Sequence, residues 1–382
     1  MNVWIDILHT PQFNFFKPLI STLSEKGYNM LITVLGRGKL PAIVKRELSG
    51  MKNVSVKVIG KHRMTKWSAL IEANALRIIR LFFWAMRNKV DIAFSSGSHI
   101  GMMGKIFKFP AYGFVDDPQT TNYKMLCKFD KQNHSLIYEL PEGQQLDPRD
   151  KMLPVLKEWA YLNPRTFRPN VRALEQYGLK PKKYIFLREV SVGTINYTGQ
   201  ESGAILGIKD MIPKGMKVLL SLEEKKRRGE YPEDWILLQE PIEDIHSLIY
   251  YAAGLVSSGD SMAREAALMG VPAYYLGIRY TMPANKAASN VAGLQNRKTM
   301  DFREWISNII ENKNINNTAC AEINHKNSSS GNQKKINENV SSVDTRAEML
   351  LKQQQELREH IDAEFIDINA YMMSLVESVD KK

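Results

Sequence analysis

The segment 257–272 combines small residues, a short predicted helix and one internal glutamate in the sequence S-S-G-D-S-M-A-R-E-A-A-L-M-G-V-P. Ser258 and Gly259 follow an apolar run, and a helix is predicted to begin near Ser261. The first turn of a helix has up to four unpaired N–H groups and roughly half a positive charge, so it can bind a diphosphate. The same small residues also suit any turn from a strand into a helix, so the pattern alone supports both interpretations.

Two acidic residues of this segment have opposite implications. Glu265 lies four residues after Ser261, one turn into the predicted helix, where its carboxylate could accept hydrogen bonds from both hydroxyls of a ribose. Asp260 weakens the diphosphate interpretation, because a carboxylate beside a diphosphate is unfavourable unless it caps the helix or faces away.

The loop 9–14 occupies the corresponding place in the first third of the chain, between a predicted strand and a predicted helix. His9 could act as a general base or as a proton donor to phosphate, since imidazole exchanges protons near neutral pH. Thr10 and Gln12 add a hydroxyl and an amide that could bind an acceptor. The alternative is a loop histidine that makes a local helix cap.

Two further loops follow predicted strands. Ser98 and His99 precede a predicted helix over 100–107 and could hold an acceptor sugar or phosphate. Asp116 and Asp117 are adjacent, so on a strand their side chains point apart, but either alone could deprotonate a hydroxyl. A plain turn is the alternative for both loops.

A long helix is predicted over 67–88, with Arg77, Arg80 and Arg87 sharing one face. Trp84 and two neighbouring phenylalanines make the segment aromatic as well as basic. We expect the helix to pack on its sheet while the arginines extend to solvent. The alternative is that the helix lies on an anionic membrane.

The spacing of apolar runs predicts an alternation of strands and helices, which occurs twice along the chain. Such alternation implies βαβ crossovers and a parallel sheet that is covered on both faces. The sequence therefore predicts an α/β fold of two Rossmann-like domains that face a cleft, with C-terminal helices. Strands are predicted at 3–8, 30–35, 54–59, 91–95 and 110–115, and again at 184–187, 216–220, 235–238, 255–257 and 273–276.

The expected boundary between the two domains is a polar, proline-containing stretch at 142–154 together with the turn at 161–164. We expect domains at 1–160 and 161–311. Residues 312–343 are rich in Asn, Ser and Lys and are predicted to form a disordered insertion. Helical periodicity returns in residues 344–382, which are expected to dock as C-terminal helices.

The composition limits the function classes. The 382 residues have a formal net charge of +11, which attracts anions, but zinc-finger and RNP-type patterns are absent, so nucleic acid is not an expected partner. No apolar run reaches the roughly 20 residues of a membrane span, so membrane contact would be peripheral. Two distant cysteines and the absence of a signal peptide indicate a cytoplasmic protein. No metal-site, nucleophile-elbow or Walker A spacing is found.

Four motifs resemble an uncharacterised bacterial and archaeal family of GT-B type. They are W-I-D-I-L-H-T-P at 4–11, F-F-K-P-L at 15–19, Y-L-N-P at 161–164 and S-M-A-R-E-A-A-L-M-G-V-P at 261–272. The resemblance covers about residues 1–300. The family is grouped with GT-B glycosyltransferases and with non-hydrolysing UDP-N-acetylglucosamine 2-epimerases, which implies two Rossmann-like domains and a nucleotide-sugar substrate.

The resemblance implies roles for individual residues. A serine-glycine turn would hold the UDP diphosphate, a helical glutamate the ribose, the loop 239–242 the base, and an arginine at a strand end the phosphates. Two departures count against epimerase chemistry: the N-terminal loop lacks the epimerase arginine, and Phe114–Pro118 replaces a His-x-Glu-Ala-Gly run. The expected donor-binding residues are Arg188, Gln239, Ile242, Ser258, Gly259, Ser261 and Glu265.

The leading hypothesis is a metal-independent and cofactor-independent glycosyltransferase that moves a sugar from a UDP-linked donor to a polysaccharide or lipid-linked acceptor. The second domain would bind the donor, and the first would bind the acceptor. His9, or failing that Asp116, would be the base, and the basic surface suits a polyprenyl-phosphate acceptor at an anionic membrane. The alternatives are a UDP-N-acetylglucosamine 2-epimerase and a non-catalytic sugar-nucleotide-binding protein. The expected acceptor-binding residues are Thr10, Gln12, Ser98 and His99.

Overall fold

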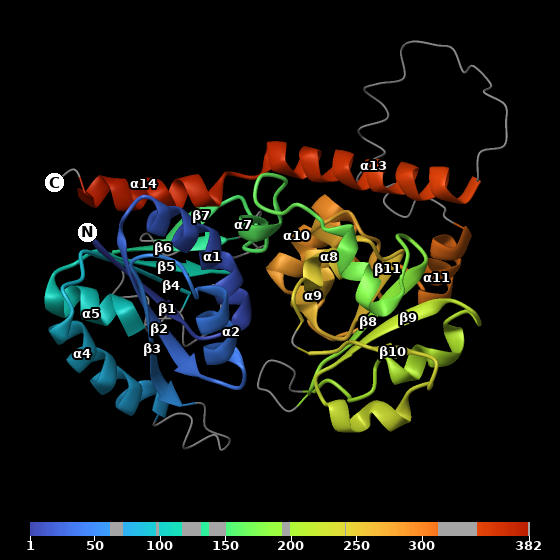
Figure 1. The fold of residues 1–382 in the computed structure, drawn as a ribbon, viewed down its shortest axis with the longest axis horizontal. Coiled ribbons are helices and arrows are strands. Elements are labelled where there is room, and N and C mark those ends of the chain that lie inside the picture. Colours follow the sequence, from blue (N-terminus) through green and yellow to red (C-terminus); the bar gives the residue numbers. More distant parts are fainter. Residues whose placement is uncertain are drawn as a thin grey trace, which may run out of the picture. The chain divides into compact units, whose positions relative to one another are not determined.

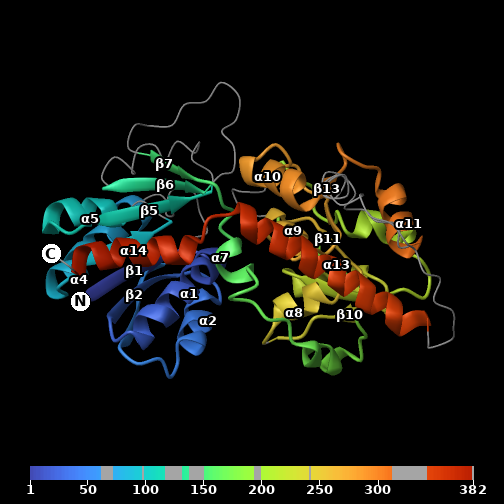
Figure 2. The ribbon, with the colours of Figure 1, turned by 90° about the horizontal axis from the view of Figure 1, so that it is seen from above.

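The structure, a computed structural model, consists of two compact α/β units (Figures 1 and 2). Unit 1 contains residues 1–161 and 365–382, and unit 2 contains residues 162–364. The last two helices therefore belong to different units. The structure describes residues 1–61, 72–96, 99–116, 131–136, 150–192, 199–240, 242–311 and 342–380.

Unit 1 is built on a parallel sheet that, in the described residues, has seven strands in the order β3-β2-β1-β4-β5-β6-β7. The strands are β1 (Asn2–Ile7), β2 (Asn29–Gly36), β3 (Val54–Lys61), β4 (Ile92–Ser95), β5 (Ala111–Val115), β6 (Gln132–Leu136) and β7 (Asp150–Leu153). The helices are α1 (Thr10–Glu25), α2 (Leu40–Glu47), a π-helical turn (Glu72–Leu76), α4 (Arg77–Arg87), α5 (His99–Phe107), the short α7 (Trp159–Leu162) at the unit boundary, and α14 (Ile368–Asp380).

Strand β1 is buried along its length and contains one charged residue, Asp6, which no solvent reaches. Its carboxylate accepts two hydrogen bonds from the guanidinium of Arg77, at 2.6 and 3.1 Å, and one from the hydroxyl of Thr33 at 2.6 Å. A buried carboxylate is tolerated only when it is paired and hydrogen-bonded in this way. The expectation that Arg77 extends to solvent is therefore wrong. Arg80, one turn later, does reach solvent and pairs with Glu72.

Strands β6 and β7 were not predicted, because both are short and polar. β7 lies inside the stretch 142–154 that was expected to be a boundary, and it forms the last strand of the sheet. β6 contributes His134, whose ring stacks on Phe114 at 4.5 Å between centroids. His134 Nδ1 lies 3.1 Å from the Gly113 carbonyl, and Nε2 lies 2.9 Å from the hydroxyl of Tyr371. Helix α14 thus docks on the sheet through a buried histidine.

Unit 2 repeats the same strand order, β10-β9-β8-β11-β12-β13, with six parallel strands in its described residues. The strands are β8 (Tyr184–Glu189), β9 (Lys217–Leu222), β10 (Ile236–Leu237), β11 (Gly254–Ser257), β12 (Ala273–Tyr275) and β13 (Gln295–Asn296). The α-helices are α8 (Ile245–Tyr250), α9 (Asp260–Leu268), α10 (Pro283–Ala292), α11 (Phe302–Glu311) and α13 (Ser342–Glu364), and 3-10 turns occur at Val171–Tyr177, Leu206–Met211 and Lys225–Glu230.

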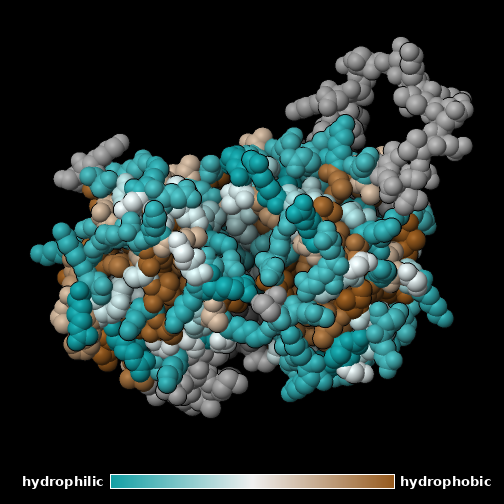
Figure 3. Space-filling model, in the orientation of Figure 1, coloured by the Kyte–Doolittle hydropathy of each residue, from teal (hydrophilic) through white to brown (hydrophobic). Residues whose placement is uncertain are grey.

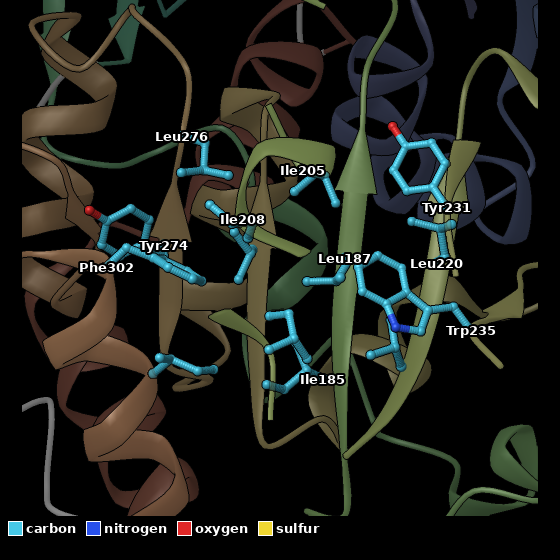
Figure 4. Packing of buried hydrophobic residues seen from close by; sticks show 14 of the residues in the cluster. Ile185, Leu187, Ile205, Ile208, Leu220, Tyr231, Trp235, Tyr274, Leu276 and Phe302 are labelled. Carbon is cyan, nitrogen blue, oxygen red and sulfur yellow. The ribbon is translucent and has the colours of Figure 1, made fainter. Parts of the chain in front are cut away.

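The core of unit 2 forms between its sheet and the elements that cover it (Figure 4). Leu187 and Leu220 come from adjacent strands, and Ile205 precedes a 3-10 turn packed on them. Tyr274 of β12 contacts Phe302 of α11 edge to face, with ring centroids 5.2 Å apart. This packing fixes β8, β9 and β12, whose ends carry the residues described below.

Helix α13 docks on unit 2 beside Gly270, the residue that ends α9 in the left-handed conformation with φ +74°. A Cβ atom at this glycine would lie 2.9 Å from Cα of Gln354, so no other residue fits without a shift. The Gln354 amide donates to the carbonyls of Met269 and Tyr250, at 3.0 and 3.2 Å. Most of the predicted disordered insertion, residues 312–341, lies outside the described residues.

His134 makes unit 1 sensitive to acid. Burial lowers the pKa of His134 to about 4, against an ordinary value of about 6.5. In the folded state the ring therefore stays neutral down to about pH 4, whereas in the unfolded chain it binds a proton below about pH 6.5. Because the unfolded chain binds this proton first, the free energy of unfolding decreases as the pH falls from 6.5 toward 4. We expect the free energy of unfolding to fall by about 2 kcal/mol between pH 7.5 and pH 5 through this residue.

Urea unfolding at the two pH values measures this loss. His134→Phe keeps a flat ring against Phe114 and should reduce the pH dependence by that amount, even if its stability at pH 7.5 is lower. His360→Gln, at an exposed position of α13, is the control and should keep the full pH dependence. An unchanged pH dependence in His134→Phe would contradict the prediction.

Candidate functional site

The carboxyl ends of β8, β9 and β11 meet at one edge of the sheet of unit 2. Ser257 is the register partner of Arg188, which in turn is the partner of Ser221. Strand order changes direction between β8 and β11, and ligands of doubly wound sheets bind outside the strand ends at this switch point. Helix α9 begins at this place, three residues after Ser257.

The turn from β11 into α9 is held by its own serines. Ser257 Oγ donates to the Gly259 carbonyl at 2.7 Å and accepts from the Gly259 amide at 3.0 Å. Ser258 Oγ accepts from the Val190 amide at 2.9 Å, and its own amide donates to the Arg188 carbonyl at 3.0 Å. The Ser258 hydroxyl thus joins the ends of β8 and β11. The backbone N–H groups of Ser258 and Gly259 therefore already have acceptors within the protein.

Asp260, the first residue of α9, is buried and turned toward cations. Its Oδ2 lies 3.0 Å from the guanidinium of Arg279 and 3.7 Å from that of Arg264. Its Oδ1 accepts from the Ser261 amide at 2.9 Å. The negative charge that weakened the diphosphate interpretation is therefore neutralised locally.

Arg279 is a residue of this edge that sequence reasoning missed. It follows β12, its side chain is about one-quarter exposed, and Asp260 holds it at the start of α9. The signal available in the sequence was a basic residue just after a strand whose end lies at the same edge. Arg188 is the second cation there, and it is bound to Ser221 Oγ at 2.9 Å and to Glu223 at 2.5 Å.

Glu265 lies one turn into α9 with its side chain 8% exposed, as the sequence placed it. Its Oε1 is 3.6 Å from Nε2 of His246, in the first turn of α8. His246 was also missed, since no motif connects it to Glu265. Gln239 and Ile242 precede α8, and the backbone N–H of Gln239 donates to the Tyr177 hydroxyl at 3.2 Å. The structure thus places the predicted ribose and base residues on adjacent elements.

In unit 1, His9 occupies the N-cap position of α1 without making a side-chain cap. Its Nδ1 lies 2.5 Å from the guanidinium of Arg37. Because arginine has no acceptor, Nδ1 must accept, and the neutral ring then carries its proton on Nε2. The Gln12 amide oxygen accepts from the Leu8 amide at 2.8 Å and closes the loop, while Thr10 is exposed at the start of α1.

The other candidates of unit 1 follow β4 and β5, at the same edge of the sheet as His9. His99 begins α5, is nearly buried, and its Nδ1 lies 3.5 Å from Arg77. Asp116 forms an ion pair with Lys157. Ser98 lies outside the described residues.

In the part of the chain that the structure describes, no helix is long and apolar enough to cross a membrane. The same residues hold no group of three or more His, Cys, Asp or Glu side chains suited to a metal ion.

Residues 1–103 match the family model described as "Protein of unknown function (DUF354)". The "Uncharacterized protein MJ0665" of Methanocaldococcus jannaschii is 23% identical over 292 residues, which cover 71% of this chain and 80% of that protein. These matches confirm the predicted resemblance to an uncharacterised family.

Solved structures with a similar fold include a UDP-GlcNAc 2-epimerase and two glycosyltransferases. The UDP-GlcNAc 2-epimerase of Methanocaldococcus jannaschii, in complex with UDP-GlcNAc and UDP, gives a TM-score of 0.58 at 15% identity and covers 85% of this chain and 99% of its own. The glycosyltransferase VinC, in complex with DTDP, gives 0.58 at 8% identity over 100% of both chains. The spinosyn rhamnosyltransferase SpnG gives a TM-score of 0.57 at 11% identity and covers 98% of this chain and 100% of its own. Together they confirm the predicted fold: α/β of GT-B type, with two Rossmann-like units and C-terminal helices.

Proposed function

We propose that this protein is a glycosyltransferase that moves a sugar from a nucleotide diphosphate donor, with UDP as the expected nucleotide, to a glycan or lipid-linked acceptor. The observation that carries the proposal is the edge of unit 2, where the start of α9 adjoins Arg279 and Glu265 lies one turn further along. Proteins of this fold have been solved with UDP and with DTDP.

The donor site follows from the chemistry of that edge. The helix start and Arg279 provide N–H donors and positive charge for the diphosphate, since Asp260 is already neutralised. Glu265 provides two acceptor oxygens for the ribose hydroxyls. Arg188, at the end of β8, is a second cation for the phosphates. This positive charge also stabilises the diphosphate as it departs, so the proposal includes no metal and no cofactor.

Unit 1 would bind the acceptor through Thr10, Gln12, Ser98 and His99. His9 is the first candidate for the base that deprotonates the acceptor hydroxyl. Its contact with Arg37 requires that this arginine leave Nδ1 before the ring accepts a proton there. An anionic acceptor would draw Arg37 away. Asp116 is the second candidate, and it would have to release Lys157.

A sugar-nucleotide 2-epimerase is the second candidate function. It is favoured by the fold shared with UDP-GlcNAc 2-epimerases and by Arg37, which brings an arginine to the first loop although the loop itself has none. Incubation with UDP-N-acetylglucosamine and no acceptor separates the two functions. An NMR signal from the 2-epimer would establish the epimerase and exclude the transferase proposal.

Glu265 tests the donor site. In calorimetry with nucleotide diphosphates, Glu265→Gln should weaken UDP binding about 10- to 100-fold, because hydrogen bonds to a charged acceptor are lost. The wild type should also discriminate against 2′-deoxy-UDP, whereas the variant should bind both ligands equally. Glu304→Gln, at an exposed position of α11, is the control and should bind like the wild type. Unchanged UDP affinity in Glu265→Gln would favour a different binding site.

Arg279 tests the phosphate contact separately. Arg279→Gln should lower UDP affinity about tenfold or more and leave uridine affinity unchanged, because uridine lacks the diphosphate. Added salt should also weaken UDP binding less in Arg279→Gln than in the wild type, because one contact between a cation and the phosphates is lost. Arg303→Gln, exposed on α11, serves as the matched control. Equal losses for uridine and UDP would show that Arg279 supports the fold of the site and does not contact phosphate.

A further inference from the structure

Helix α4 has apolar residues on the side that faces solvent. Ile79, Phe83 and Met86 are 51, 47 and 53% exposed, and Leu76, just before the helix, is 38% exposed. Their spacing of three or four residues places them in one stripe. The opposite side is already buried against the sheet through residues that include Leu81 and Ala85. The exposed apolar stripe on the outer side of α4 is therefore not part of the hydrophobic core of unit 1.

Helix α5 extends this apolar surface. Ile106 is 50% exposed near the end of α5. The rings of Phe82 and Phe83 are 5.5 Å apart, and Phe82 contacts Phe107 of α5 at 5.3 Å. We call Leu76, Ile79, Phe83, Met86 and Ile106 the α4–α5 face. Figure 3 shows apolar side chains at the lower left, where Figure 1 places α4.

The charged side chains of α4 and α5 are all positive. Neither the segment 77–87 nor the segment 99–107 contains an aspartate or glutamate. Arg80 is nearly half exposed, and Arg87, Lys105 and Lys108 are exposed as well. Glu72, just before the helix, is buried and pairs with Arg80.

We infer that the α4–α5 face docks on an anionic lipid bilayer. Apolar side chains between cations on an interfacial helix insert at the boundary of headgroups and acyl chains, while the cations bind anionic headgroups. A protein partner with an acidic rim, or a second copy of this chain, would be a different occupant. A second copy is disfavoured because two such faces would bring like charges together. The inference is independent of the proposed activity.

Vesicle cosedimentation tests the docking. The full-length protein should bind vesicles of phosphatidylcholine with 30% phosphatidylglycerol, about tenfold more tightly than pure phosphatidylcholine vesicles. The double variant Phe83→Gln, Met86→Gln should lose at least tenfold in binding, since it removes two inserting side chains. The double variant Arg87→Gln, Lys108→Gln should lose about tenfold on the anionic vesicles only.

The double variant Val171→Gln, Met349→Gln is the matched control, because these apolar residues of unit 2 are 49 and 51% exposed. It should bind vesicles like the wild type, and all variants should melt within a few degrees of it. Equal binding to neutral and anionic vesicles, or full binding by Phe83→Gln, Met86→Gln, would overturn the inference. The inference would also be overturned if the wild type did not bind vesicles and formed a dimer in light scattering that Phe83→Gln, Met86→Gln converted to a monomer.

Discussion

One buried carboxylate, Asp260, orients two arginines at the carboxyl edge of unit 2. Asp260 sits at the positive end of α9, where its charge alone would repel a phosphate. The contacts with Arg264 and Arg279 reverse this effect, since two guanidinium groups now accompany one carboxylate. Asp260 and Arg264 are both buried, and removing one partner of a buried pair costs about 3–5 kcal/mol. In the proposed donor site, a diphosphate would meet an arginine that is already oriented by Asp260.

Unit 1 contains a similar aspartate–arginine pair near the carboxyl edge of its own sheet. Asp6 in the centre of the sheet fixes Arg77, and Arg77 lies beside His99 at the start of α5. In both units an aspartate next to a strand end holds an arginine that comes from another element. The resulting geometry depends on buried, hydrogen-bonded charges.

Local pattern predicted most of the fold, because strands buried on both faces read as apolar runs and helices as 3.6-residue periods. It missed β6 and β7, whose short polar sequences are stabilised by contacts from Tyr371, more than 200 residues away. The helical spacing placed Arg77 in solvent, because spacing within a helix does not reveal that Asp6 of β1 lies beside it in the fold. Glu265 was located from its distance to a helix start. Arg279 and His246 were not, since their partners Asp260 and Glu265 are brought near only by the fold.

The division of the C-terminal helices between the two units also affects how the chain is made. Unit 2 is complete only when residues up to 364 have been synthesised, and unit 1 waits for residues 365–382 although its sheet ends at β7. At roughly 5–20 residues per second, the nascent unit 1 would spend about 10–40 seconds outside the ribosome without α14. During that time His134 lacks Tyr371, and α1 lacks its contact with α14. The order of synthesis thus leaves unit 1 unfinished until α14 emerges.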